Sequence, residues 1–268
     1  MTIAAETLMT TAADPLVRRD RDARGVVTLT LNRPHAFNAL SEAMLAALQR
    51  ELDAIASDES VRVVVLAAQG KAFCAGHDLK EMRAQPSLEY YQELFARCTR
   101  MMLTLRRLPV PVIARVQGIA TAAGCQLVAQ CDLAVASSTA RFAVSGVNLG
   151  LFCSTPSVPL SRNVARKQAF EMLVTGEFID AAQAQARGLV NRVAEPARLD
   201  AEIESLAASI VAKPRAVVAM GKELFYRQAE LGIEAAYDAA GETMACNMMD
   251  AAALEGVQAF IEKRKPRW

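Results

Sequence analysis

A stretch of small residues between two apolar runs constrains the fold of this chain more than any other feature. The sequence from Val116 to Ser137 reads VQGIATAAGCQLVAQCDLAVAS. We expect a strand, a small-residue turn that ends near Gly124, a buried helix and a second strand. Because Gly and Ala carry little side-chain bulk, the turn can approach another group closely. The first N–H groups of the helix have no helical partner and suit a developing oxyanion.

A second passage from strand to helix lies upstream. The apolar segment Val61–Ala67 predicts a strand, and small residues follow it up to Gly76. A helix can begin within His77–Met82. Two such turns can supply two converging N–H donors, but the local pattern does not show whether they converge.

Composition restricts the class of protein. The 268 residues are 53% hydrophobic and 22% charged, which is typical of a globular chain. A net charge of +1 gives no support to a nucleic-acid partner, and no apolar run reaches membrane-spanning length. The chain has six cysteines without a CxxC pair and only two histidines. This combination argues against a metal site of the zinc type and predicts reduced thiols in a cytoplasmic protein.

Strands and helices alternate through most of the chain. Strands are predicted at 25–32, 61–67, 111–115, 133–136, 141–144 and 189–193, and helices at 41–56, 87–108, 160–176 and 181–187. This alternation predicts an α/β fold with crossover connections. The segment Ser145–Pro159 is predicted to be a loop that either lines a pocket or packs on the core.

The chain divides into three predicted parts. Residues 1–15 are expected to be a flexible tail without a secretory signal, and residues 16–197 form the α/β body. Residues 198–268 are predicted to be helical, with breaks at Pro214 and Gly232. Their apolar positions suit packing on the body or on a neighbouring subunit.

Several ordered segments carry a family resemblance. They read LNRPHAFNAL (31–40), FCAGHDLKEM (73–82), GIATAAGCQLVAQCDLAVAS (118–137), FEMLVTGEFIDAAQAQARGLVNRV (170–193) and EGVQAFIEKRKPRW (255–268). In this order they resemble the motifs of the enoyl-CoA hydratase/isomerase (crotonase) family. The resemblance implies a crotonase-like spiral of ββα units with a helical C-terminal trimerisation region. It also implies a homotrimer, or a hexamer built as a dimer of trimers.

The resemblance further implies a site for an acyl-CoA thioester. In the family, two backbone N–H groups bind the thioester oxygen, and the matching positions here are His77 and Ala123. Coenzyme A is then part of the substrate, and no permanently bound cofactor is expected. CoA contacts should fall on His77, Asp78, Leu79 and Lys80, and on Phe260 and Lys263, which resemble residues that reach the nucleotide end of CoA, often across a subunit interface. The basic residues around Lys263 fit a solvated helix end equally well.

The chain departs from the family at both acid/base positions. Hydratases of the family use two glutamates, and simple isomerases keep the second. Gln126 and Gly146 stand at these positions, and neither residue can transfer a proton. Since a positioned acid or base contributes about 10²–10⁴-fold, we expect reduced hydration or a different CoA-ester reaction.

Two classes of function therefore stay open. The first is a lyase or isomerase of fatty-acid metabolism that acts on acyl-CoA with altered activity. The second is a non-catalytic acyl-CoA-binding or regulatory protein, and a scaffold subunit of a mixed oligomer is a weaker third. We interpret the His77 side chain as solvent-facing or capping rather than as a proton-transfer group. Asp132 is predicted to anchor the strand that follows it.

Overall fold

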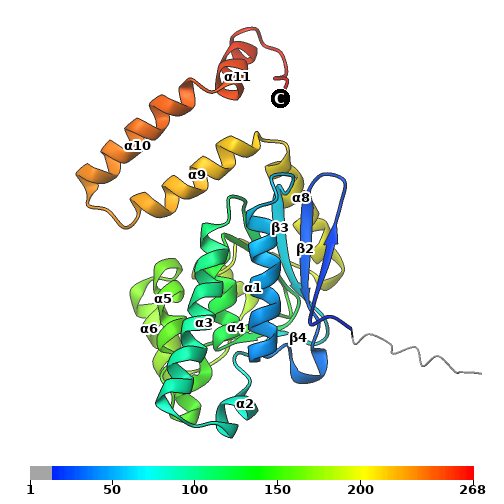
Figure 1. Cartoon of the computed structure of the whole chain (residues 1–268), viewed down its shortest axis with the longest axis vertical. Helices are drawn as coiled ribbons and strands as arrows, with labels where there is room; N and C mark the ends of the chain where they lie inside the picture. The colour runs from blue at the N-terminus through cyan, green and yellow to red at the C-terminus, as the bar shows by residue number, and fades with distance from the viewer. Residues whose placement is uncertain (1–13) are drawn as a thin grey trace, which may run out of the picture.

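The computed structural model describes residues 14–268. An α/β body occupies its N-terminal part, and helices form its C-terminal part (Figure 1). The predicted flexible tail lies outside the described residues except for Asp14 and Pro15.

The larger sheet contains six strands of the described chain. Their order is β1 (Val17–Arg21), β2 (Val26–Leu31), β3 (Val63–Ala68), β5 (Val112–Val116), β7 (Leu133–Ser137) and β10 (Arg192–Ala194). β1 is antiparallel to β2, and the other pairs are parallel. Every residue of β3 is buried, which explains why an unbroken apolar run forms this strand. The sequence prediction missed β1, because its sequence VRRDR is mostly charged and partly exposed.

The smaller sheet is made of short strands that lie close to the two small-residue turns. In the described residues its order is β4 (Ala72–Cys74), β6 (Ile119–Thr121), β8 (Arg141–Ala143) and β9 (Ile179–Asp180). β4, β6 and β8 are parallel, and β9 is antiparallel to β8. β6 lies inside the segment that was predicted to be a turn. The turn itself is therefore shorter than expected.

Helices cover the sheets of the body (Figure 1). Their bounds are η1 (Pro34–Ala36), α1 (Glu42–Ala56), α2 (Leu79–Ala84), α3 (Leu88–Arg107), α4 (Ala123–Gln130), η2 (Ser145–Leu149), α5 (Ser154–Asn163), α6 (Arg166–Thr175), α7 (Ala181–Ala186) and η3 (Pro196–Arg198). Ser41 and Ser87 cap the N-termini of α1 and α3 through their side chains, which fixes where the predicted helices begin.

The predicted loop at 145–159 is wrong in its second half. Residues from Ser154 onward form α5, although Pro156 and Pro159 lie within it. Pro156 is the third residue of the helix, where a backbone N–H has no helical acceptor. A proline therefore removes no hydrogen bond at that position.

The C-terminal helices are α8 (Leu199–Val211), α9 (Arg215–Gln228), α10 (Ile233–Met248) and α11 (Ala251–Ile261). The predicted breaks at Pro214 and Gly232 are confirmed as the N-caps of α9 and α10. α8 packs on the larger sheet through Leu199, Ile203 and Ala207. α10 and α11 extend away from the body (Figure 1) and expose apolar side chains, among them Ile233, Tyr237, Met244, Leu254 and Phe260.

Asp132 joins α9 to the body. Its Oδ2 accepts hydrogen bonds of 2.7 Å from the Val112 N–H and from Lys222 Nζ, and its Oδ1 accepts one of 2.7 Å from the Tyr226 hydroxyl. Burial lowers the pKa of Lys222, and Asp132 opposes that shift. The prediction that Asp132 anchors β7 is thus confirmed, and the same carboxylate also fastens α9.

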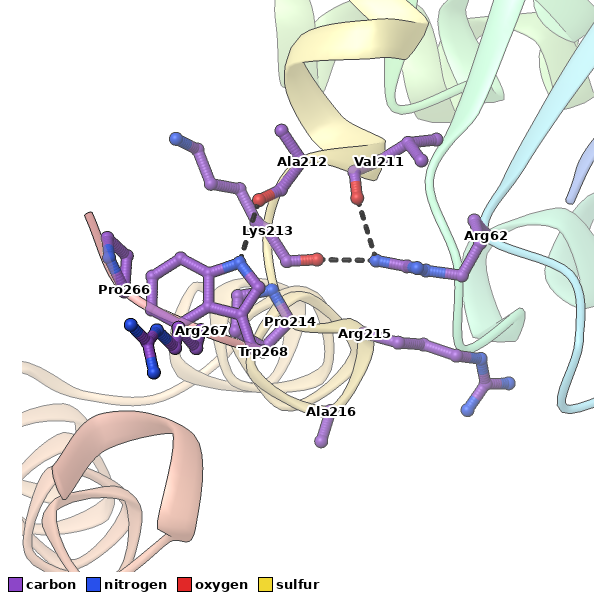
Figure 2. Close-up of a pocket in the computed structure, with 10 residues that line it drawn as sticks. All are labelled: Arg62, Val211, Ala212, Lys213, Pro214, Arg215, Ala216, Pro266, Arg267 and Trp268. Carbon is purple, nitrogen blue, oxygen red and sulfur yellow. Dashed lines mark hydrogen bonds between the residues drawn. The ribbon is translucent and has the colours of Figure 1, made fainter. Parts of the chain in front are cut away.

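The chain returns to the junction of α8 and α9 at Trp268 (Figure 2). The indole Nε1 donates to the Ala212 carbonyl oxygen at 3.0 Å, and Arg62 Nη2 donates to the Val211 carbonyl at 2.9 Å. A cavity of about 570 Å³ lies here, away from the two small-residue turns. Arg267 lies beside the indole, whereas the side chains of Arg62 and Arg215 lie farther from it and point in different directions (Figure 2).

Candidate active site

The first turn connects β4 to α2 and is held by the N-terminal motif. The Leu40 N–H donates to the Gly76 carbonyl at 2.8 Å, and the Ala75 N–H donates to the Phe37 carbonyl at 3.1 Å. Gly76 has a φ of +94°, a conformation that L side chains rarely adopt. The turn therefore depends on a glycine at this position.

The buried side chain of Asn38 ties the N-terminal motif to the chain before β4. The residue is fully buried, and its Nδ2 donates to the carbonyl oxygens of Gln69 and Ala72 at 2.8 and 2.9 Å. Its Oδ1 accepts from the Arg33 N–H at 2.9 Å. One carboxamide thus joins the η1 segment to the chain that enters β4. The sequence motif pointed to this segment but not to the role of Asn38.

The second turn connects β6 to α4. Ala122 is the N-cap residue of α4, with φ 50° and ψ −123°, and its N–H donates to the Ala143 carbonyl at 3.0 Å. A Cβ at Gly124 would lie 2.0 Å from the Cys74 carbonyl oxygen. Only a glycine at 124 permits this approach, so the start of α4 packs directly against the end of β4.

The two turns meet at the positions predicted from the sequence. A Cβ placed on Gly76 would lie 3.2 Å from the Ala123 nitrogen. Within residues 14–268, neither the His77 N–H nor the Ala123 N–H donates a hydrogen bond to the protein. Two adjacent backbone donors without acceptors can bind a carbonyl oxygen that gains negative charge.

Asp78 belongs mainly to the scaffold of the site. Its Oδ1 caps α2 by accepting from the backbone N–H groups of Lys80 and Glu81, and its Oδ2 accepts from Arg33 Nη1 at 2.7 Å. Burial alone would raise the pKa of Asp78, but these hydrogen bonds together lower it. Leu79 and Lys80 are exposed beside it.

The side chain of His77 is not solvent-facing, which corrects the sequence interpretation. Both ring nitrogens are inaccessible to solvent and lack a hydrogen-bond partner in the described residues. The ring packs edge-on against Phe95 of α3, with 5.5 Å between centroids. Burial lowers the pKa of His77 and favours the neutral ring; the Leu40 carbonyl opposes that shift without completing a hydrogen bond.

Gln126 lies one turn into α4. Its side chain is only 5% exposed, and its Oε1 has no hydrogen-bond partner among the described residues. Residues three apart share a helix face, so Gln126 lies on the same face of α4 as Ala123.

The structure leaves no room for a side chain at Gly146. Gly146 is buried in η2, and its N–H donates to Cys153 Sγ at 3.3 Å. A Cβ here would lie 2.5 Å from the Leu151 carbonyl oxygen and 2.8 Å from Cys153 Sγ. The adjacent Ser145 hydroxyl pairs with Thr121 at 2.8 Å, a contact that no sequence motif indicated.

The remaining predicted residues lie elsewhere. Phe260 lies in α11 and Lys263 just after it, and Figure 1 shows α11 at the opposite end of the molecule from α2. Both are exposed. The structure therefore does not bring them to the turns of their own chain, and any role beside His77 requires a second copy.

Metal-binding and membrane-spanning features can be assessed for residues 14–268. No group of three or more His, Cys, Asp or Glu side chains in this range is arranged to hold a metal ion. All six cysteines are free, and burial raises the pKa of Cys74 to about 12. No helix in the described range has the length and apolar character needed to cross a membrane.

Comparisons with known proteins agree with this architecture. The family model for enoyl-CoA hydratase/isomerase matches residues 21–268. Enoyl-CoA hydratase domain-containing protein 3, mitochondrial, from Mus musculus is 44% identical over 256 residues, covering 96% of this chain and 85% of the relative. The Xenopus laevis protein of the same name is 47% identical over 244 residues, covering 91% of this chain and 83% of its own length.

Solved structures show the same fold. An enoyl-CoA hydratase from Mycobacterium smegmatis superimposes with a TM-score of 0.94 at 73% identity, covering 95% of this chain and 99% of that one. Human enoyl Coenzyme A hydratase domain-containing protein 3 superimposes with a TM-score of 0.91 at 43% identity, covering 94% of this chain and 100% of that one. Together with the two sheets and the paired turns, these similarities show that the chain belongs to the enoyl-CoA hydratase/isomerase (crotonase) family and has its α/β fold with C-terminal helices.

Proposed function

We propose that this protein binds acyl-CoA thioesters and polarises the thioester carbonyl between the N–H groups of His77 and Ala123. The observation that carries the proposal is that both N–H groups lack acceptors at two turns in contact. Preorganised donors of this kind typically contribute about 10²–10³-fold in rate each. They would stabilise negative charge on the oxygen when hydroxide from the solvent removes a proton from the carbon next to the thioester and becomes water.

The reaction must differ from ordinary hydration by the two-glutamate route. Gln126 cannot exchange a proton, and the backbone around Leu151 fills the space beside Gly146. Each absent acid or base removes about 10²–10⁴-fold. We therefore propose slow hydration at best, with the carbonyl-polarising step retained.

A solvent exchange experiment tests this proposal. Butyryl-CoA is incubated with the protein in deuterated water, and loss of the proton next to the thioester is followed by NMR, while crotonyl-CoA hydration is followed in parallel. We expect exchange above the uncatalysed rate and little hydration. If the protein catalyses neither proton exchange nor turnover of any CoA ester, the proposal that it is an enzyme is contradicted.

The second candidate is a non-catalytic acyl-CoA-binding or regulatory protein. The filled position beside Gly146 favours it, because the loop there leaves no space for a catalytic side chain. Tight binding of butyryl-CoA without proton exchange would identify this function. Absence of any CoA binding would instead leave the scaffold role.

We also propose a homotrimer or a dimer of trimers in the cytoplasm. The exposed apolar side chains of α10 and α11 support assembly, and a neighbouring copy could bring Phe260 and Lys263 to the site. Light scattering of the purified protein measures the assembly, and a monomer would contradict it. Relatives from vertebrates are named mitochondrial, so location is tested by fractionating cells that express the chain.

A further inference from the structure

The chain reverses direction after α11, and residues 262–268 return beside that helix. We call them the return segment. Lys263 has a φ of +55°, in the left-handed region where residues other than glycine are uncommon. The Arg264 N–H then donates to the Ala259 carbonyl oxygen at 2.9 Å. The return segment therefore begins with a sharp turn at Lys263.

Glu255 of α11 holds the return segment against its own helix. Its carboxylate accepts hydrogen bonds from Arg264 Nη1 and Nη2 at 2.5 and 2.9 Å, and from the Arg267 backbone N–H at 2.8 Å. These hydrogen bonds, those from Arg264 above all, lower the pKa of Glu255 to about 2, so its carboxylate is charged at neutral pH. The return segment and α11 are thus tied into one unit.

Trp268 connects this unit to the body. On one side the indole lies against α11, because a Cβ at Gly256 would be 3.3 Å from its Cζ3 atom. On the other side, the indole Nε1 donates at 3.0 Å to the carbonyl oxygen of Ala212, the C-cap residue of α8 (Figure 2). Since α8 packs on the larger sheet, this one side chain links α11 directly to the body.

Packing within one chain does little to fix the orientation of α11. Among the described residues, α11 buries only Ala259 and α10 buries only Ala236. Both helices lie away from the body in Figure 1. Most helical stability in proteins comes from packing of an apolar face, so a helix with one buried residue needs another restraint. The return segment supplies that restraint.

We infer that Trp268 is a positioning residue, which sets the direction of Phe260 and Lys263 toward the nucleotide end of an acyl-CoA bound to a neighbouring copy. This inference rests on the proposed function, because it requires CoA thioesters to bind in an assembly of copies. Phe260 is 85% exposed, and Lys263 forms the turn into the return segment, so both side chains follow α11. Fixing their direction in advance lowers the entropic cost of binding.

Calorimetric titration with two esters tests the inference. Butyryl-pantetheine carries the thioester of butyryl-CoA but no nucleotide. We expect Trp268→Ala to weaken butyryl-CoA binding about three- to tenfold, as for loss of one hydrogen bond, and to leave butyryl-pantetheine binding unchanged. Equal weakening of both esters, or of neither, would overturn the inference and leave the proposed function intact. Failure of the unmodified protein to bind either ester would overturn both.

A combined variant assigns the effect to the two side chains on and after α11. Phe260→Ala with Lys263→Ala removes the groups that Trp268 is inferred to position. Adding Trp268→Ala to this pair should then weaken butyryl-CoA binding no further, because residues that act through one another are not additive. A further threefold or larger loss would overturn the positioning role.

A second substitution disturbs the indole without removing it. Gly256→Leu fills the place where the ring meets α11, so it should repeat the selective loss of butyryl-CoA binding. Gly241→Leu on α10 is the matched control, because a Cβ there meets nothing within 4 Å. Melting temperatures confirm that both variants fold. Equal binding of butyryl-CoA by the two variants would contradict the role of the indole contact.

Discussion

The two turns and the 145–153 segment differ in what their close packing leaves open. At the turns, Gly76 and Gly124 bring two backbone segments into contact, and the N–H groups of His77 and Ala123 stay free. After β8, by contrast, the chain folds inward until Leu151 and Cys153 fill the space beside Gly146. The first region leaves two backbone donors without acceptors, and the second leaves no room for a side chain at position 146.

This difference shows which kind of chemistry withstands sequence change. Donors on the main chain persist as long as the glycines allow the turns to meet. Acid/base chemistry depends on side chains, and neither Gln126 nor Gly146 can transfer a proton. The four substitutions below test the contrast between the regions, beginning with the largest expected effect.

The substitution Gly76→Ala should break the first region. Its Cβ would lie 2.9 Å from Ala122 Cβ and 3.2 Å from the Ala123 nitrogen, at a φ of +94°. We expect proton exchange of butyryl-CoA to fall by about 10²–10³-fold, as for loss of one oxyanion donor. Gly188→Ala provides the control, since Gly188 also has a positive φ (+83°) but lies in the α7–β10 connection. Similar losses in both variants would contradict the role of the turn.

The substitution Gln126→Glu should restore a proton-transfer group beside intact donors. We expect proton exchange to rise by about 10²-fold. Burial raises the pKa of a carboxyl group, so the base form and the gain should appear only as pH increases through that raised pKa. A pH profile of the exchange rate measures this, with Gln49→Glu as the control. A flat profile at the rate of the unmodified protein would refute the prediction.

The substitution Gly146→Glu should not restore the second glutamate. Because even its Cβ would lie 2.5 Å from the Leu151 oxygen, we expect the free energy of unfolding to fall by about 1–3 kcal/mol. Added to Gln126→Glu, it should bring no further hydration of crotonyl-CoA. Gly221→Glu is the control, because a Cβ there meets nothing within 4 Å. Unchanged stability in urea unfolding would mean that the segment moves aside easily.

The substitution Ala122→Gly tests whether the turn holds strain. At φ 50° and ψ −123° an alanine is in a region that favours glycine. Relief of this strain should raise the free energy of unfolding by about 1 kcal/mol. The exposed helical position Ala54→Gly should lower it by about the same amount. Destabilisation by both substitutions would show that Ala122 is relaxed.

The sequence predicted the parts of the fold that depend on local patterns. The apolar run of β3, the helical periodicity of α1 and the breaks at Pro214 and Gly232 all appear where expected. β6 was missed because three residues are too few to show the alternation of side chains that marks a strand. α5 was missed because its prolines suggested a loop. In both places, pairing or packing with distant segments decides the structure.

The site was predictable to a similar extent. The local pattern predicted two small-residue turns, the family resemblance assigned His77 and Ala123 to them, and the structure brings these turns together. The burial of the His77 ring and the filled space beside Gly146 depend on α3 and on residues 151–153, which no local pattern connects to the turns. Such contacts between remote segments become visible only in three dimensions.

The attachment of α9 through Asp132 has a consequence for how copies of this chain could associate. The buried ion pair between Lys222 and Asp132 disfavours exchange of α9 between molecules, because removing Lys222 would leave the Asp132 carboxylate without its cation. Copies of this chain would then associate as fully folded subunits. The rate of association should rise with protein concentration and show no slow phase from helix detachment.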